Sequence, residues 1–130
     1  MTDIAVSHEQ GRVPVTVFHL NGDLNHEEPL QSRAKEVYQA GTRHLLLDLT
    51  AVPYISSAGL RALHQVYMLL SNSAGESDKE VRQGIAAGTY KSPHLKLLKP
   101  SKNAAKALSI SGYDMFLEIH KDLAGAVASF

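Results

Sequence analysis

The amino-terminal third of the chain alternates between apolar and polar stretches in a way that predicts two strands. Residues 3–7 form a short apolar stretch, and residues 13–20 form a longer one. The longer stretch has apolar side chains on both faces, which is typical of a strand that is covered on both sides or lies at the centre of a sheet. The polar turn at residues 9–12 contains a glycine, so we expect an antiparallel hairpin.

Two amphipathic helices and a buried strand follow this hairpin. Apolar residues recur at helical spacing in residues 27–40, after Asn25 as the expected N-cap. Residues 44–49 are a compact apolar run that suits a buried strand, and residues 58–71 again show helical spacing. A strand, a helix and a strand joined by short links predict a βαβ unit whose two strands are parallel.

The remainder of the chain continues the alternation after a long polar segment. Residues 71–92 form a connection longer than is usual in a compact domain, and such a segment is either functional or disordered. The pattern is completed by a strand at 94–98, a helix that begins at Ser101 and ends at Gly112, a strand at 115–119 and a final helix after residue 122. We therefore expect a single α/β domain over residues 1–130, with a mixed, mostly parallel sheet of about five strands and about four helices.

The composition is that of an ordinary globular protein without net charge. Apolar residues make up 44%, and 13 Lys and Arg balance 13 Asp and Glu. This charge balance argues against electrostatic binding of nucleic acid and against a polybasic membrane anchor. The absence of cysteine excludes disulfides, thiolate catalysis and zinc–sulfur sites. No apolar run is long enough for a membrane span and no signal peptide is recognisable, so we expect a cytoplasmic protein.

The run Ser56-Ser57-Ala58-Gly59, here called the serine turn, is the first candidate site, because it follows a predicted parallel strand and opens a helix. Free N–H groups and a partial positive charge at a helix start stabilise a phosphate. A serine there is therefore a candidate phosphoacceptor, and the added charge would alter the docking of a partner. The alternative is that Ser56 or Ser57 is only an N-cap.

The strand-to-helix turn around Leu24 is a second candidate, because turns after neighbouring parallel strands lie at the same edge of a sheet. We therefore expect Asp23 and Asn25 to lie near the serine turn, with Asp48 and Thr50 below them. The alternative is that these polar residues serve turn formation and helix capping alone.

Other chemistries find less support in the sequence. The serine turn lacks the glycine that precedes the serine in a Gly-x-Ser-x-Gly nucleophile elbow. The chain has seven histidines that could complete a catalytic triad, but the sequence singles out none of them. No two histidines have the i+2, i+3 or i+4 spacing of metal ligands, and neither of the two phosphate-binding glycine loops is present. We therefore expect no enzyme activity, no metal site and no cofactor.

Residues 45–63 carry a resemblance to a known family. Leu-Leu-Leu-Asp-Leu-Thr, followed after three residues by Tyr-Ile-Ser-Ser-Ala-Gly-Leu-Arg-x-Leu, resembles the signature of STAS domains, the family of the anti-sigma factor antagonists and their relatives. Residues 22–25, Gly-Asp-Leu-Asn, resemble the family's Gly-Glu-Leu-Asp turn, and residues 108–116 resemble its closing helix and turn. The matches span nearly the whole chain in the family's order, and they imply the family's α/β fold.

The resemblance implies a protein-binding phospho-switch. Family antagonists bind an anti-sigma factor, which is an ATP-dependent serine kinase, and so release a sigma factor. Phosphorylation of a serine at the helix start ends binding, and a metal-dependent serine phosphatase reverses it. Alignment with the family motif makes Ser57 the implied phosphoacceptor. The implied partner-binding residues are Asp23, Asn25, Ser56, Ser57, Ala58, Gly59 and Arg61.

The sequence departs from the family pattern in three places. Ser56 stands where many members have Asp, and Asn25 replaces the Asp of the family's upstream turn. The loss of two carboxylates changes the surface offered to a kinase and reduces repulsion against a phosphate. The segment 71–92 is longer than in many antagonists. The alternative is a STAS domain with a different role. STAS domains also serve as scaffold or adaptor subunits in stress-sensing and lipid-transport complexes, without phosphorylation.

Overall fold

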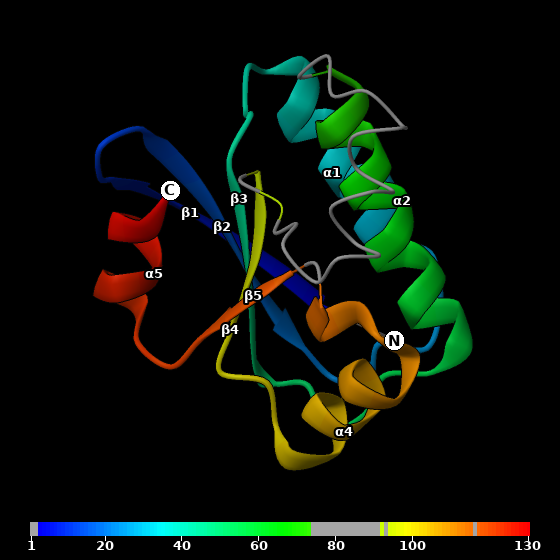
Figure 1. Cartoon of the computed structure of the whole chain (residues 1–130). Coiled ribbons are helices and arrows are strands. Elements are labelled where there is room, and N and C mark those ends of the chain that lie inside the picture. Colours follow the sequence, from blue (N-terminus) through cyan, green and yellow to red (C-terminus); the bar gives the residue numbers. More distant parts are fainter. Residues whose placement is uncertain (1–2, 74–91, 93, 116) are drawn as a thin grey trace.

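Five strands form one mixed sheet in the computed structural model, which describes residues 3–73, 92, 94–115 and 117–130 (Figure 1). The strands are β1 (Asp3–Gln10), β2 (Pro14–Asn21), β3 (Leu45–Ala51), β4 (Leu95–Leu98) and β5 (Glu118–His120), and they lie in this order across the sheet. β1 pairs antiparallel with β2, and all other neighbours are parallel. The predicted hairpin, βαβ unit and fold class are confirmed.

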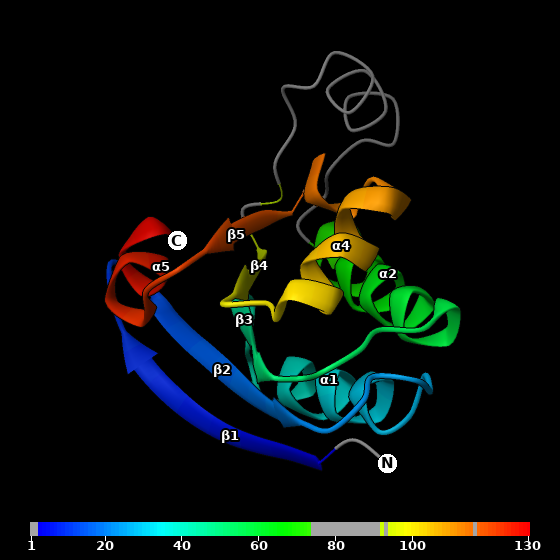
Figure 2. The same ribbon diagram turned by 90° about the horizontal axis from the view of Figure 1, so that it is seen from below.

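Helices cover the two faces of the sheet unequally. The described residues form the helices α1 (Leu30–Gln39), α2 (Ser57–Ser73), α4 (Lys102–Ser111) and α5 (Leu123–Ser129). Figure 2 shows α1, α2 and α4 on one side of the sheet and α5 on the other. A short 3-10 helix, Tyr113–Met115, follows α4.

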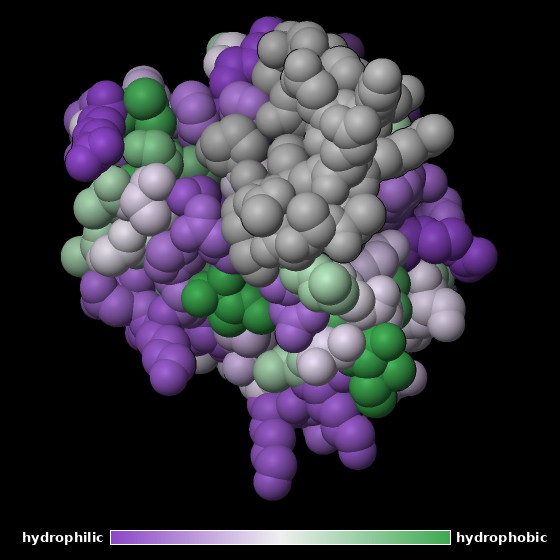
Figure 3. Space-filling model, in the orientation of Figure 1, coloured by the Kyte–Doolittle hydropathy of each residue, from purple (hydrophilic) through white to green (hydrophobic). Residues whose placement is uncertain are grey.

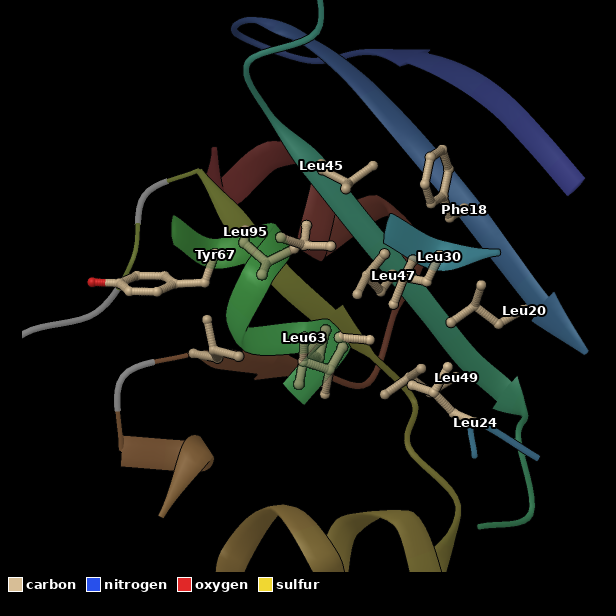
Figure 4. Close-up of a cluster of buried hydrophobic side chains, with 14 of the residues drawn as sticks. Phe18, Leu20, Leu24, Leu30, Leu45, Leu47, Leu49, Leu63, Tyr67 and Leu95 are labelled. Atoms are coloured by element: carbon tan, nitrogen blue, oxygen red, sulfur yellow. The ribbon is translucent and has the colours of Figure 1, made fainter. Parts of the chain in front are cut away.

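Strand alternation divides the buried side chains between the two faces. The larger cluster lies beneath α1, α2 and α4 (Figure 4), and its strand members include Phe18, Leu20, Leu45, Leu47, Leu49, Leu95 and Leu97. The smaller cluster lies beneath α5 and consists of Val15, Val17, Leu46, Leu98, Ala126 and Val127. Successive residues of a strand point to opposite faces, so β2 and β3 supply both clusters. This is why these strands are apolar on both sides.

The first helix begins later than predicted, at Leu30 rather than at residue 27. Asn25 is not its N-cap, because the N-cap position is Pro29 and no side chain caps the helix there. The residue before a proline is disfavoured in helical conformation, so Glu28 cannot continue a helix into Pro29. The acidic pair at residues 27–28 therefore belongs to the approach to α1.

The second helix and the last strand also differ in extent from the prediction. α2 continues to Ser73, and residues 74–91 of the predicted long connection lie outside the described residues. The last strand is Glu118–His120 instead of residues 115–119. The chain leaves α4 through Gly112 at φ 81° and enters a 3-10 turn, in which the N–H of Met115 donates to the carbonyl of Gly112 at 3.1 Å.

Lys96 on β4 links α5 to the sheet. It is almost fully buried, with 3% of its side chain exposed. Its Nζ lies 3.0 Å from Oε2 of Glu118 on β5. The same Nζ donates to the carbonyl of Ser129 at 2.9 Å and to its Oγ at 3.0 Å, and it lies 4.9 Å from the ring centre of Phe130. A buried ammonium is tolerated only with such partners, so the charge on β4 and the position of α5 depend on each other.

We expect Glu118→Gln to destabilise the protein more than Lys96→Met. The first substitution leaves a buried ammonium without its counter-ion, which typically costs about 3 kcal/mol. The second leaves a carboxylate whose side chain is 36% exposed and can be hydrated, while methionine fills the space of the lysine stem. Urea unfolding followed by circular dichroism measures both losses. Equal losses of stability, or a greater loss for Lys96→Met, would show that an unpaired ammonium at position 96 is not the costlier defect.

Candidate functional site

The carboxyl edge of the sheet brings the two predicted turns into contact. Leu24 and Ile55 form an isolated parallel bridge. The N–H of Leu24 donates to the carbonyl of Tyr54 at 2.9 Å, and the N–H of Ser56 donates to the carbonyl of Leu24 at 3.0 Å. The Leu24 turn and the serine turn therefore lie side by side, as the order of parallel strands predicts.

Gly59 permits this contact. An ideal Cβ at Gly59 would lie 2.1 Å from the carbonyl oxygen of Leu24 and 3.0 Å from Cγ2 of Ile55. The first distance is far shorter than a non-bonded contact, so no side chain fits at this position while the turns touch. The glycine here serves the close approach of α2 to the Leu24 turn.

The two serines at the start of α2 have different surroundings. Ser56 is partly buried, and its Oγ accepts the N–H of Gly59 at 3.3 Å and donates to the carbonyl of Leu24 at 3.4 Å. Ser56 is therefore the N-cap of α2. Ser57 is the first residue of the helix, and it is exposed. Its hydroxyl forms no hydrogen bond with any of the described residues.

Asp23 and Asn25 flank Leu24 and so border the serine turn. Asp23 is exposed, whereas Asn25 is partly buried. The Oδ1 atom of Asn25 is enclosed and has no hydrogen-bond partner within the described part of the chain. An enclosed oxygen without a donor contributes nothing to holding the turn, so the backbone bonds of Leu24 carry that task.

Arg61 lies one helical turn after Ser57 and contacts the segment before α1. Its Nε is 3.3 Å from Oε1 of Glu27, and the two side chains are 68% and 39% exposed. An ion pair this exposed is weak. Residues four apart on a helix share a side, so the guanidinium can serve either Glu27 or a group on Ser57. The sequence alone does not identify Glu27, because its approach to Arg61 depends on how α1 and α2 are placed.

A shallow groove of about 430 Å³ begins next to the serine turn. Its lining residues are Tyr54, Ile55, Asn103, Lys106, Ala107 and Ile110. Tyr54 is 53% exposed and Ile110 is 78% exposed. On the face shown in Figure 3, small hydrophobic areas are separated by hydrophilic side chains. Sequence reasoning missed this groove, because helical spacing alone does not show that an apolar residue such as Ile110 faces solvent.

Asp48 and Thr50 form a polar centre separate from the serine turn. Oδ1 of Asp48 accepts the N–H of Thr50 at 3.0 Å and its hydroxyl at 2.6 Å, and Oδ2 lies 2.8 Å from Nδ1 of His19. Burial acts to raise the pKa of Asp48. The hydrogen bonds from Thr50 and His19 outweigh burial and hold this pKa below its ordinary value.

Metal-binding and membrane-spanning features are absent from the part of the chain that the structure describes. No three His, Asp or Glu side chains there come together in a way that could hold a metal ion. No helix in these residues combines the length and the apolar character needed to cross a bilayer.

A family model settles where the chain belongs. The model described as the STAS domain matches residues 6–77, which is more than half of the chain and includes both turns. The chain belongs to the STAS domain family. No functionally curated protein matches this STAS domain.

Solved structures share the fold of this STAS domain at low sequence identity. An anti-sigma factor antagonist from Mycobacterium paratuberculosis has a TM-score of 0.69 at 17% identity, covering 99% of this chain and 93% of that one. A Thermotoga maritima protein assigned to the same class has a TM-score of 0.67 at 19% identity, covering 95% and 90%. The antagonist SpoIIAA in its unphosphorylated form has a TM-score of 0.58 at 15% identity, covering 93% and 92%. At these identities the likeness shows the SpoIIAA-like fold alone.

We expect Gly59→Ala to destabilise this STAS domain, although alanine is the better helix former by about 1 kcal/mol. The added Cβ would meet the carbonyl of Leu24, so the start of α2 and the Leu24 turn would have to separate. The loss should exceed that of Ser56→Ala, which removes an N-cap and typically costs about 1 kcal/mol. Denaturant unfolding of the three proteins measures the difference. A Gly59→Ala protein as stable as the wild type would show that the two turns are free to move apart.

Proposed function

We propose that this STAS domain is an anti-sigma factor antagonist, a module that binds an anti-sigma factor serine kinase without a catalytic role for the serine turn and is inactivated by phosphorylation of Ser57. Its membership of the STAS family and the fold that it shares with antagonists support this function. The observation that carries the proposal is the contrast between the two serines. The hydroxyl of Ser56 is engaged in capping α2, whereas Ser57 presents an exposed hydroxyl at the same helix start.

A phosphate on Ser57 would occupy a favourable electrostatic position. The N–H groups of the first turn of α2 have no partners within the helix, and the helix dipole places partial positive charge there. Phosphorylation adds a charge of about −2. Ser56 and Asn25 are uncharged, so neither repels this group. The modification would change the charge of the surface without unfolding it, which suits a switch that a serine phosphatase resets.

The proposed docking surface surrounds Ser57. It comprises Asp23, Asn25, Ser56, Ser57, Ala58, Gly59 and Arg61. The adjoining groove, with the exposed side chains of Tyr54 and Ile110, would supply the apolar contact. Buried apolar anchors provide most of the binding energy of an interface, and the polar rim gives it specificity. A new dianion beside such a groove would have to be desolvated on binding, which disfavours the complex. The proposal implies a cytoplasmic protein.

Anti-sigma serine kinases from the same organism, supplied with ATP and Mg²⁺, should phosphorylate the wild type and Ser56→Ala but not Ser57→Ala. Fragmentation mass spectrometry locates the phosphate, and Ser56→Ala is the matched control because it alters the neighbouring hydroxyl. The phosphorylated protein should lose its affinity for the kinase that bound the unmodified form.

Equal modification of the Ser57→Ala protein would contradict the proposal. So would protein from native cells that never carries phosphate on Ser57 across several growth conditions. That second outcome would favour a scaffold or adaptor subunit that acts without phosphorylation.

We further expect Arg61 to exchange Glu27 for the phosphate when Ser57 is modified. A cation beside the phosphate favours its dianion and so lowers its second pKa. Phosphoserine can be installed at position 57 by genetic encoding, and ³¹P NMR then follows the titration. Arg61→Gln should raise the second pKa of the phosphate by about 0.3, the effect of one exposed i,i+4 pair. Glu27→Gln should lower it, because a competing carboxylate is removed. Identical titrations in all three proteins would exclude the exchange.

A further inference from the structure

Three side chains on neighbouring strands form a continuous hydrogen-bonded chain on the face of the sheet that carries α5. Ser7 lies on β1, His19 on β2 and Asp48 on β3. Oγ of Ser7 is 2.9 Å from Nε2 of His19, and Nδ1 of His19 is 2.8 Å from Oδ2 of Asp48. Strand register explains the alignment, since His19 is the partner of Asp48 and lies diagonally across from Ser7.

The direction of each hydrogen bond in this chain follows from its two ends. Thr50 donates twice to Oδ1 of Asp48, which leaves Oδ2 to accept from His19. An ionised carboxylate only accepts, so Nδ1 of His19 must carry the imidazole proton. In the neutral imidazole Nε2 is then the unprotonated nitrogen, and it accepts the hydroxyl proton of Ser7. The hydroxyl of Ser7 is therefore polarised by His19, and the tautomer of His19 is fixed by its hydrogen bond to Asp48.

The members of this hydrogen-bonded chain differ in exposure. The side chain of Asp48 is 20% exposed and that of His19 is 39% exposed, while Ser7 is partly buried. Ala5, the strand partner of His19, is exposed and presents only a methyl group beside it. α5 packs against other positions of this face, in the cluster that includes Val17. A small molecule can therefore approach the Ser7–His19 pair while the carboxylate stays sheltered.

We propose that Ser7 is a nucleophile activated by His19 and positioned through Asp48, and that it accepts an acyl group from a small activated ester or thioester. Hydroxyl, imidazole and carboxylate in this order perform acyl transfer on several unrelated folds, so the geometry and not the fold carries the assignment. The site lies on the sheet face that carries α5, whereas α2 and its serine turn pack on the opposite face (Figure 2).

Acylation of Ser7 needs no reactant other than the ester or thioester, and the hydrolysis that follows consumes one water. Oγ of Ser7 forms a bond to the acyl carbon, the bond from that carbon to the leaving oxygen or sulfur breaks, and the serine proton passes to Nε2 of His19. His19 then protonates the leaving group. Water, with His19 again as base, hydrolyses the acyl-serine to free serine and a carboxylic acid.

β1 is an edge strand, and its unpaired backbone N–H groups point outward in the plane of the sheet, away from β2. The open sheet surface around Ser7 therefore offers few donors oriented toward a developing oxyanion. We therefore expect the acyl-serine to form in stoichiometric amount and to hydrolyse slowly, which makes it directly observable.

The experiment exposes the full-length protein to p-nitrophenyl acetate and follows acetylation by intact mass and peptide mapping. Ser7 should be acetylated about a hundredfold faster than exposed Ser57, in line with the contribution of a general base. Ser7→Ala should remove this label, and His19→Gln should slow it by the same factor. Ser109→Ala and His8→Gln are matched controls, because each changes an exposed serine or histidine outside the proposed chain, and in both variants Ser7 should be acetylated at the wild-type rate.

The proposal is wrong if Ser7 reacts no faster than Ser57, or if His19→Gln leaves its rate unchanged. Nitrogen NMR of His19 provides a readout that does not require a variant to fold. The wild type should carry the imidazole proton on Nδ1, and a proton on Nε2 would overturn the assignment. Asp48→Asn should move the proton to Nε2, because the introduced amide can donate to Nδ1, and should slow acetylation in parallel. Unchanged acetylation with the tautomer reversed would show that Asp48 has no positioning role.

Discussion

The contact between the backbone of Leu24 and the start of α2 is the constraint on which the candidate site depends. Two hydrogen bonds of 2.9 and 3.0 Å join Leu24 to Tyr54 and Ser56, and they are possible only because residue 59 has no side chain. The contact brings the end of one βα turn against the beginning of the next helix. It fixes Ser56 as a cap, leaves Ser57 at the surface, and puts Glu27 within reach of Arg61.

The two faces of the sheet support different kinds of chemistry. The face beneath α1, α2 and α4 is mostly apolar, and its buried Thr16, hydrogen-bonded to Thr42, lies at the end of β2 away from the two turns. The face beneath α5 mixes a small apolar cluster with polar side chains, among them the Ser7–His19–Asp48 chain and the buried Lys96. Among the described helices α5 alone lies on this face, and it covers only part of the sheet. The uncovered part can remain polar because water reaches it.

Periodicity was sufficient to predict most of the fold, because strands and helices leave different spacings of apolar residues. It located both turns at one edge, since the carboxyl ends of parallel strands always share an edge. It failed at the start of α1, where the restriction imposed by Pro29 outweighs the capping preference of Asn25. It also could not identify the hydrogen-bonded chain on the other face. Ser7 and His19 are 12 residues apart, and His19 and Asp48 are 29 apart, so only the strand register brings them together.

The buried position of Lys96 has a consequence for the dynamics of the carboxyl-terminal helix. A seven-residue helix has little intrinsic stability and would ordinarily fray on a fast timescale. Undocking α5 removes the carbonyl and the hydroxyl of Ser129 from an ammonium that lies inside the protein. Local opening of α5 is therefore coupled to hydration of a charge on β4. Amide exchange in this short helix should consequently follow the opening of the sheet edge at β4 and β5, as one cooperative unit, rather than the fraying of a chain end.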